Sequence, residues 1–270
     1  MTTTTGATAR HRVAARSTLS WRVVVDHPRT GAQNMALDHA LTLALARGAG
    51  IMRLYTWTRP TVSFGRNEPA RDHYSSGRAG EMQTDFVRRP TGGRAVLHDD
   101  ELTYMIAVPA RATGGARETY RRVNRGLAMG IRSLGVEVDL EPDGATPGLD
   151  AGPCFQGPAG GELVAGGRKL VGSAQARIGS ALLQHGSIIL GGDPSPVWDR
   201  YGGYRWQPAA NLHDLAPGLH LDALRKALVE GVAETMGGAW TSGGLDEGEL
   251  SAARTLEQER YGTEEWTWRR

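Results

Sequence analysis

The apolar residues of this chain occur in short runs that Gly and Pro interrupt, and this pattern limits the folds open to it. Four runs in the first half have the β-branched and aromatic composition of strands. They are residues 21–25, 52–57, 61–64 and 102–108. The predicted strands and helices do not alternate in a repeating strand–helix–strand pattern. We therefore expect an α+β fold, in which helices flank a mixed, mostly antiparallel β-sheet.

Helices are predicted where apolar residues recur at helical spacing. They are residues 35–47, 118–134, 221–236 and 248–260. Asn34 is the expected N-cap of the first helix, and Gly48 is its expected end. Further strands are predicted at residues 136–140, 162–165, 168–171 and 182–190. Gly166 and Gly167 separate two of them and predict a tight β-hairpin.

The first residues differ in composition from the rest. Residues 1–20 contain three arginines, no acidic residue and no apolar core of a signal peptide. We expect a disordered N-terminal tail, with a transit peptide as the alternative. Residues 21–270 are expected to form one domain, with a helical C-terminal part at about 220–270. No apolar run approaches the roughly 18 residues of a membrane span, and no basic nucleic-acid patch is evident, so a cytoplasmic location is expected.

Cysteine and lysine are both rare in this chain. Cys154 is the only cysteine, which excludes disulfides within the chain and suits a reducing compartment. A lone cysteine is most often a small buried hydrophobic residue. Only two of the 31 Lys and Arg residues are lysines, Lys169 and Lys226. A retained lysine suggests a site that needs a compact ammonium group, although either one can be a chance survivor.

Three segments place polar or glycyl residues in or beside apolar strands, where burial needs a hydrogen bond or a ligand. They are residues 88–104, residues 154–155 and residues 167–187. In the first, Gly92 and Gly93 allow a close approach of backbone amides to a ligand, and Arg88, Arg89 and Arg94 could meet an anion. Taken alone, the Gly-Gly pair is more simply explained as a hairpin turn.

In this order and spacing, the segments resemble the biotin/lipoate protein ligase and lipoyl transferase superfamily. The resemblance rests on Arg-Arg-x-x-Gly-Gly-x-Ala-Val-x-His-Asp at residues 88–99 and Lys-x-x-Gly-Ser-Ala at residues 169–174. The chain is most similar to the cysteine-dependent octanoyltransferases, because Cys154 and Phe155 fall where those enzymes carry their nucleophile.

The resemblance implies a protein N-octanoyltransferase of lipoate biosynthesis, with residues 21–270 as a single catalytic acyltransferase domain. Such an enzyme moves an octanoyl or lipoyl group from acyl carrier protein to a lysine of a lipoyl-carrier domain, in the glycine-cleavage H protein or a 2-oxoacid dehydrogenase E2. Cys154 would be the nucleophile that forms a thioester, and Lys169 would favour its thiolate. No cofactor, metal, nucleic acid or membrane is expected.

The same resemblance implies a set of substrate-binding residues around the acyl group. They are Arg89, Gly92, Gly93, Arg94, His98, Gly172, Ser173, Ala174, His185 and Gly186. For His98 and His185, a neutral structural role is the alternative.

Three other functions remain open from the sequence. An ATP-dependent lipoate-protein ligase would use ATP and Mg as cofactors, and residues 88–94 would hold the phosphates of the ATP. Lys169 would bind the carboxylate of lipoate, and Cys154 would have no catalytic role. An amidotransferase that relays octanoate from the glycine-cleavage H protein would use the same Cys and Lys. A non-enzymatic acyl-binding protein is the fourth reading.

Overall fold

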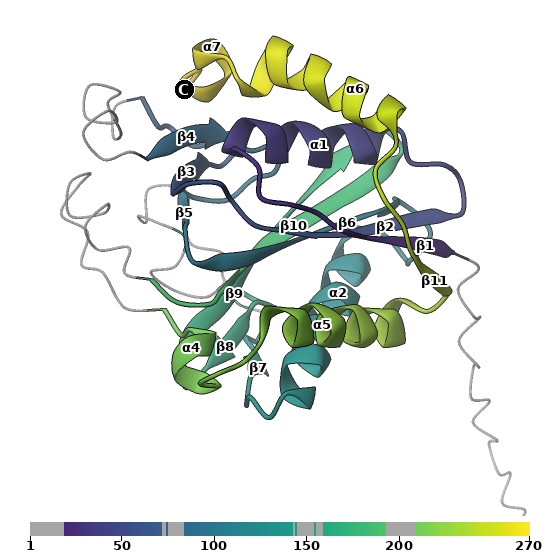
Figure 1. Cartoon of the computed structure of the whole chain (residues 1–270), viewed down its shortest axis with the longest axis vertical. Helices are drawn as coiled ribbons and strands as arrows, with labels where there is room; N and C mark the ends of the chain where they lie inside the picture. Colours follow the sequence, from purple (N-terminus) through teal and green to yellow (C-terminus); the bar gives the residue numbers. More distant parts are fainter. Residues whose placement is uncertain are drawn as a thin grey trace, which may run out of the picture.

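The computed structural model describes residues 19–71, 74, 84–142, 144, 154, 159–192 and 209–270. Within them, helices flank an eight-stranded sheet, and a three-stranded sheet lies beside it (Figure 1). Helix α1 (Gly31–Leu43) covers one face, with α6 (Glu247–Leu256) packed outside it. Helices α2 (Ala116–Ser133) and α5 (Leu221–Met236) cover the other face. None of the described helices is long and apolar enough to cross a membrane.

The larger sheet has the strand order β11-β1-β2-β6-β10-β9-β8-β7. Its strands are β1 (Ser20–Val25), β2 (Ala49–Tyr55), β6 (Glu101–Pro109), β7 (Asp139–Leu140), β8 (Leu163–Ala165), β9 (Arg168–Ile178), β10 (Ala181–Ile189) and β11 (Ala239–Ser242). Strand β1 pairs in parallel with β2 and β11, and the other pairs are antiparallel. The predicted α+β class with a mostly antiparallel sheet is confirmed.

The smaller sheet has the order β4-β3-β5, and short helices complete the described chain. The strands are β3 (Thr61–Phe64), β4 (Asp85–Arg88) and β5 (Val96–His98). The short helices are α4 (Leu212–Leu215), the π-helix η3 (Glu257–Tyr261) and α7 (Glu264–Thr267). This small sheet carries the loop that contains Gly92 and Gly93, and it holds that loop next to β9 and β10.

The two faces of the larger sheet bury separate cores because side chains alternate along each strand. On β6, Tyr104 and Ile106 pack into the core beneath α2 and α5. Their neighbours Met105 and Ala107 pack into the core beneath α1. Strand β10 alternates in the same way, so residues next to each other in sequence serve different cores.

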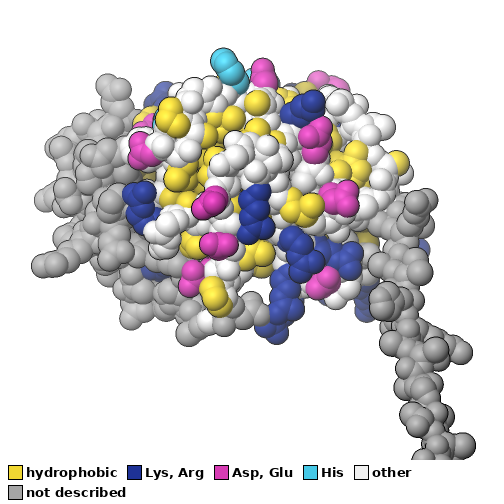
Figure 2. Space-filling view, turned by 90° about the horizontal axis from the view of Figure 1, so that it is seen from below, with side chains coloured by type: hydrophobic (Ala, Val, Ile, Leu, Met, Phe, Trp, Pro, Cys, Tyr) yellow, Lys and Arg dark blue, Asp and Glu magenta, His cyan; other side chains and the backbone are white. Residues whose placement is uncertain are grey.

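Helix α2 is amphipathic, as its spacing predicts. Val123, Leu127 and Ile131 are fully buried. The exposed surface of the helix includes Arg121 and Arg125. Figure 2 views this face of the molecule and shows basic side chains gathered next to hydrophobic and acidic ones.

Helix α1 begins earlier than predicted, and the prediction of Asn34 as its N-cap is wrong. Thr30 is the N-cap and forms a capping box with Gln33, which satisfies the first free N–H groups of the helix. Asn34 lies inside the helix and is fully buried. The helix ends at Leu43 with Ala44 as its C-cap, so Gly48 is not its end either.

Several predicted strand bounds also change. The predicted strand 136–140 is reduced to β7, whereas the predicted strand 168–171 extends to Ile178 as β9. Strands β4, β5 and β11 were not predicted. Ser20 begins β1 and so does not belong to the predicted tail, of which residues 1–18 lie outside the described residues.

A buried guanidinium ties the first strand, the first helix and the second strand together. Arg53 on β2 is completely buried. It donates to Asp26 Oδ2 from Nε at 3.0 Å and from Nη2 at 2.8 Å, and to Asp38 Oδ1 at 2.7 Å. It also donates to Asn34 Oδ1 at 2.7 Å and lies 3.8 Å from the centre of the Tyr55 ring. Two acids and one amide therefore satisfy a charge that would otherwise be costly to bury.

Helices α2 and α5 cross at glycines that let their backbones touch. A Cβ atom added to Gly130 would lie 2.4 Å from the carbonyl oxygen of Ala227, and one added to Gly231 would lie 2.2 Å from that of Gly126. Real Cβ atoms do not approach backbone oxygens so closely, so any larger residue must push the helices apart.

We predict that Gly130→Ala destabilises the protein. At an unconstrained helical site the same change stabilises by about 1 kcal/mol, but overpacking here should cost about 1–3 kcal/mol. Urea unfolding measures the difference, with the exposed Ser251→Ala in α6 as the control. A Gly130→Ala protein as stable as the wild type would show that the helices can separate without cost.

Candidate active site

The structure brings together the predicted nucleophile and the predicted cation. Lys169 Nζ lies 3.1 Å from Cys154 Sγ and also donates to the Cys154 carbonyl oxygen at 3.1 Å. A third residue completes the group, because Glu162 Oε2 lies 2.7 Å from the same Nζ. Lys169 and Glu162 are each 2% exposed, whereas Cys154 is half-buried. A thiol, an ammonium and a carboxylate thus meet in one partly closed site.

Local structure explains how Lys169 reaches this position. Gly166 and Gly167 have φ angles of 55° and 73°, and they form the tight turn between β8 and β9. The predicted hairpin is confirmed. Lys169 pairs with Val164 just past the turn, and Glu162 directly precedes β8. The hairpin therefore carries both charged groups of the site on one rigid unit.

The charge of Lys169 depends on its two partners. Burial lowers the pKa of Lys169, but the negative charges of Cys154 and Glu162 outweigh burial and raise it above its ordinary value of 10.5. Lys169 is therefore a stable cation at neutral pH. A cation in contact with a thiol favours the thiolate, which is the nucleophilic form of cysteine.

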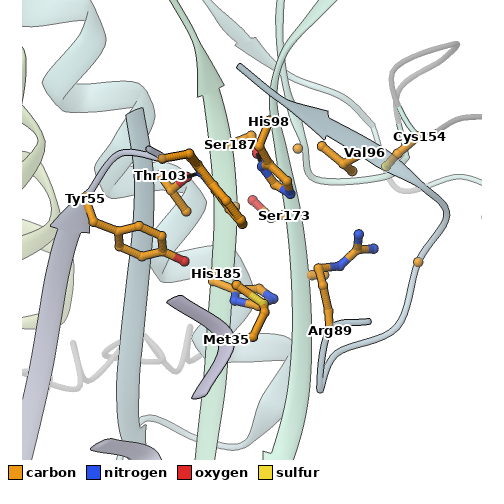
Figure 3. A pocket seen from close by; sticks show the side chains of 15 residues that line it. Met35, Tyr55, Arg89, Val96, His98, Thr103, Cys154, Ser173, His185 and Ser187 are labelled. Carbon is orange, nitrogen blue, oxygen red and sulfur yellow. Dashed lines mark hydrogen bonds between the residues drawn. The ribbon is translucent and has the colours of Figure 1, made fainter. Parts of the chain in front are cut away.

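A pocket lies beside Cys154. Its lining is mainly apolar and comprises Met35, Tyr55, Trp57, Arg89, Gly93, Val96, His98, Thr103, Cys154, Gly172, Ser173, Ala174, His185, Gly186 and Ser187. Figure 3 shows Cys154 next to Val96 on one side of the pocket and Tyr55 on the other, with His185 and Met35 between them. A slender apolar group attached to the sulfur could extend into this space.

Most of the predicted substrate-binding residues line this pocket. The structure places Arg89, Gly93, His98, Gly172, Ser173, Ala174, His185 and Gly186 there. Gly92 and Arg94 are not among the lining residues. Arg94 instead approaches the Cys154 carbonyl oxygen from Nη2 at 3.4 Å.

The guanidinium of Arg89 hydrogen-bonds to the backbone of the loop that contains Gly92 and Gly93. Arg89 Nη1 donates to the Ser63 carbonyl and hydroxyl oxygens, both at 2.6 Å. Its Nη2 donates to the carbonyl oxygens of Gly92 and Arg94, both at 3.0 Å. Gly93 has a φ of 93°, a conformation that favours glycine. In this arrangement the terminal nitrogens of Arg89 hold the loop.

The neighbouring Arg88 is also engaged with backbone. Its side chain is fully buried and donates to the carbonyl oxygens of Gly65, Glu68 and Thr267 at 2.7–2.9 Å. Arg88 therefore links β4 to the C-terminal segment that contains Thr267. It is not among the residues that line the pocket.

The loop also positions Cys154. Glu68 accepts the backbone N–H groups of Gly65 and Ala95 at 2.9 and 2.8 Å, which joins the end of the loop to the segment that follows β3. The Ala95 carbonyl oxygen then accepts the backbone N–H of Cys154 at 2.8 Å. The nucleophile is thus anchored to the Gly-Gly loop on one side and to Lys169 on the other.

Both histidines of the pocket are held in buried hydrogen-bond networks. His98 Nε2 lies 2.6 Å from Ser63 Oγ, its Nδ1 lies 2.8 Å from Glu101 Oε1, and its ring stacks on Trp57 at 4.0 Å. His185 Nδ1 lies 3.0 Å from Asp38 Oδ2. Burial lowers the pKa of His185 below its ordinary value, although Asp38 opposes this effect. His185 is therefore neutral at neutral pH and shapes the pocket without adding charge.

Sequence reasoning did not identify Glu162, nor the pocket residues Met35, Tyr55 and Trp57. Glu162 is the first residue of the predicted strand 162–165, where an acidic residue usually faces solvent. Only its 2.7 Å contact with the buried Lys169 reveals its role. Met35, Tyr55 and Trp57 reach the pocket from α1 and from the segment at the end of β2. They follow ordinary core patterns, so nothing in their spacing marks them as pocket residues.

Among the residues that the structure describes, no group of three or more His, Cys, Asp or Glu side chains could hold a metal ion. The reactive groups that the structure brings together here are the thiol of Cys154, the ammonium of Lys169 and the carboxylate of Glu162. A thiolate held beside an ammonium, with an apolar pocket at hand, can accept an acyl group as a thioester.

Comparison with known proteins finds relatives along most of the chain. The family described as lipoyl protein ligase A/B catalytic domain matches residues 30–233. Octanoyltransferase LipM of Carboxydothermus hydrogenoformans is 34% identical, and that of Kyrpidia tusciae is 36% identical. Each alignment covers 93% of this chain and 99% of the relative. The predicted resemblance to this superfamily, and to its octanoyltransferases, is confirmed.

Solved structures show the same fold. The putative lipoate protein ligase Ta0514 of Thermoplasma acidophilum with bound lipoic acid has a TM-score of 0.77 at 24% identity, and the match covers 93% of this chain and all of that one. A lipoate-protein ligase A bound with ATP has a TM-score of 0.76 at 23% identity, covering 93% of this chain and 99% of that one. At these identities the likeness concerns the fold.

We predict that Lys169→Ala slows alkylation of Cys154 by iodoacetamide at neutral pH by about tenfold or more, because the cation 3.1 Å from the sulfur is lost. Lys169→Arg should not restore the rate, since a planar guanidinium cannot take the place of the compact ammonium. Lys226→Ala, which removes the only other lysine, is the matched control. Equal rates in all four proteins would show that Lys169 does not act on the thiol.

Proposed function

Because this chain belongs to the lipoyl protein ligase A/B catalytic-domain family, we propose that it transfers an octanoyl group from acyl carrier protein, through a thioester on Cys154, to a lysine of a lipoyl-carrier domain. The observation that carries the proposal is the 3.1 Å contact between Cys154 Sγ and Lys169 Nζ beside an apolar pocket. The curated octanoyltransferase relatives support octanoyl as the group that is moved in lipoate biosynthesis.

The reaction proceeds in two steps. The Cys154 thiolate attacks the carbonyl carbon of the donor thioester, a new C–S bond forms, and the carrier's thiolate leaves and takes a proton from solvent. The neutral amine of the acceptor lysine then attacks the same carbon, a C–N bond forms, and the amine gives up a proton to solvent. The bond to Cys154 breaks, and the thiolate returns to its position beside Lys169.

The pocket supplies affinity for the acyl tail. Each buried methylene contributes roughly 0.8 kcal/mol, so most of the binding energy of an eight-carbon chain comes from apolar contact. Met35, Trp57 and Val96 provide such surface, and Gly172 and Ala174 leave room above β9.

The proposed reaction needs neither ATP nor a metal ion. Acyl transfer from a thioester starts from an activated group, and transfer to an amine is downhill. The donor is acyl carrier protein, and the acceptor is the lipoyl-carrier domain of the glycine-cleavage H protein or of a 2-oxoacid dehydrogenase E2. A free catalytic thiol suits the reducing cytoplasm.

We predict that mixing the protein with octanoyl-acyl carrier protein in the absence of ATP adds one octanoyl mass to the chain. The adduct should be lost with hydroxylamine, as a thioester is, and should be absent from Cys154→Ala and nearly absent from Cys154→Ser. Intact-mass spectrometry makes the measurement. Transfer to a lipoyl domain by the alanine variant would contradict the nucleophile assignment.

We also predict that ATP with magnesium, alone or with lipoate, binds no more tightly than about millimolar. The reason is that the side chains of Arg88 and Arg89 are engaged with backbone carbonyl oxygens. Calorimetric titration tests this, with an ATP-binding lipoate-protein ligase as the positive control. Micromolar binding, or pyrophosphate release with lipoate, would favour a ligase.

A further inference from the structure

Glu162 is held in place more firmly than an ordinary ion-pair partner. Its Oε2 accepts the backbone N–H of Ala159 at 2.7 Å, besides its contact with Lys169, and its Oε1 accepts that of Ser173 at 3.3 Å. Its own backbone N–H donates to the Ala159 carbonyl oxygen, and its carbonyl oxygen accepts the N–H of Glu141. The carboxylate therefore keeps its position whatever state Cys154 is in.

The charge on Cys154 changes during the proposed reaction. As a thiolate it is one of two anions that face Lys169, and as a thioester it is neutral. Glu162 then remains an anion in contact with Lys169, with its Oε2 2.7 Å from Nζ. A lysine that is 2% exposed loses its proton readily when no anion is near, because burial disfavours the charged form.

We propose that Glu162 keeps Lys169 protonated while Cys154 carries the acyl group, so that the second transfer finds a cation beside the departing sulfur. This inference rests on the proposed function for its role in turnover. Glu162 does not line the pocket and acts through Lys169, so it is a positioning residue. Its effect is greatest in the acylated state, since in the free enzyme the thiolate also supports the ammonium.

The other titratable groups around this pair do not replace Glu162. Tyr120 on α2 and Tyr104 on β6 are influenced by the charge of Glu162, and burial raises the pKa of both above the ordinary value, so both are neutral. Arg89 and Arg94 face Cys154 from the Gly-Gly loop and add positive charge. As cations they cannot stabilise the ammonium of Lys169, whereas the carboxylate of Glu162 does.

The rarity of lysine allows a direct test. Lysine labelled with ¹³C at Cε gives signals from Lys169 and Lys226 alone. Cys154 is first blocked with iodoacetamide, which leaves a neutral thioether in place of the thioester. The signals are then followed from about pH 6 to about pH 11 in the wild type and in Glu162→Gln, with Lys226 as the internal reference.

We expect the acid-dissociation constant of Lys169 in the blocked protein to rise at least about tenfold in Glu162→Gln, while that of Lys226 stays the same. The exposed Glu118→Gln is the matched control and should leave both signals unchanged. An unchanged Lys169 titration in blocked Glu162→Gln would overturn the inference. Because this test uses no acyl donor, it decides the inference even if the proposed function fails.

The turnover role is tested in separate half-reactions. Octanoyl-loaded enzyme is mixed with a lipoyl domain at rising pH, and the loss of the thioester is timed. The wild-type rate should rise with pH as the acceptor amine loses its proton. In Glu162→Gln the rate should fall at least about tenfold below the wild type at high pH, with a smaller change in the loading step. Equal losses in both steps and at every pH would indicate a merely structural role and overturn the proposal.

Discussion

The buried guanidinium of Arg53 is the interaction on which the arrangement of the pocket depends. It joins the end of β1 through Asp26 and the helix α1 through Asp38. The second oxygen of Asp38 then accepts Tyr55 and lies 3.0 Å from His185 in the pocket. One unexposed charge thus sets the distance between the first helix and the central strands. Removal of Asp26 or Asp38 would leave the buried guanidinium with one acidic partner in place of two and with unsatisfied N–H groups.

A second chain of contacts runs from the small sheet to the sulfur. Arg89 fixes the Gly-Gly loop through backbone carbonyls, and Ala95 at the end of the loop holds the backbone of Cys154. The hairpin β8–β9 brings Lys169 and Glu162 to the same point from the other side. The nucleophile therefore sits between two rigid units, each of which is stabilised without it.

The sequence predicted the parts of the fold that depend on local signals. Helices α2 and α5 and the hairpin at Gly166 were found because periodicity and turn chemistry act over a few residues. Strand β11 was not predicted, because it is stabilised by pairing with β1, which is distant in the sequence. The start of α1 was missed because Asn34 is also a good capping residue, although Thr30 and Gln33 carry the capping-box pattern in the sequence.

The scarcity of lysine has a consequence for an enzyme that carries an activated acyl group. A thioester on the surface of a protein meets that protein's own amines at high effective concentration, and each is a competing acceptor. Here Lys169 is kept as an unreactive ammonium, and the other lysine, Lys226, lies on α5 with 77% of its side chain exposed. With arginine at nearly every other basic position, an acyl group carried on Cys154 as proposed would meet few amines of the chain itself. The lysine of the proposed carrier domain would then have little competition.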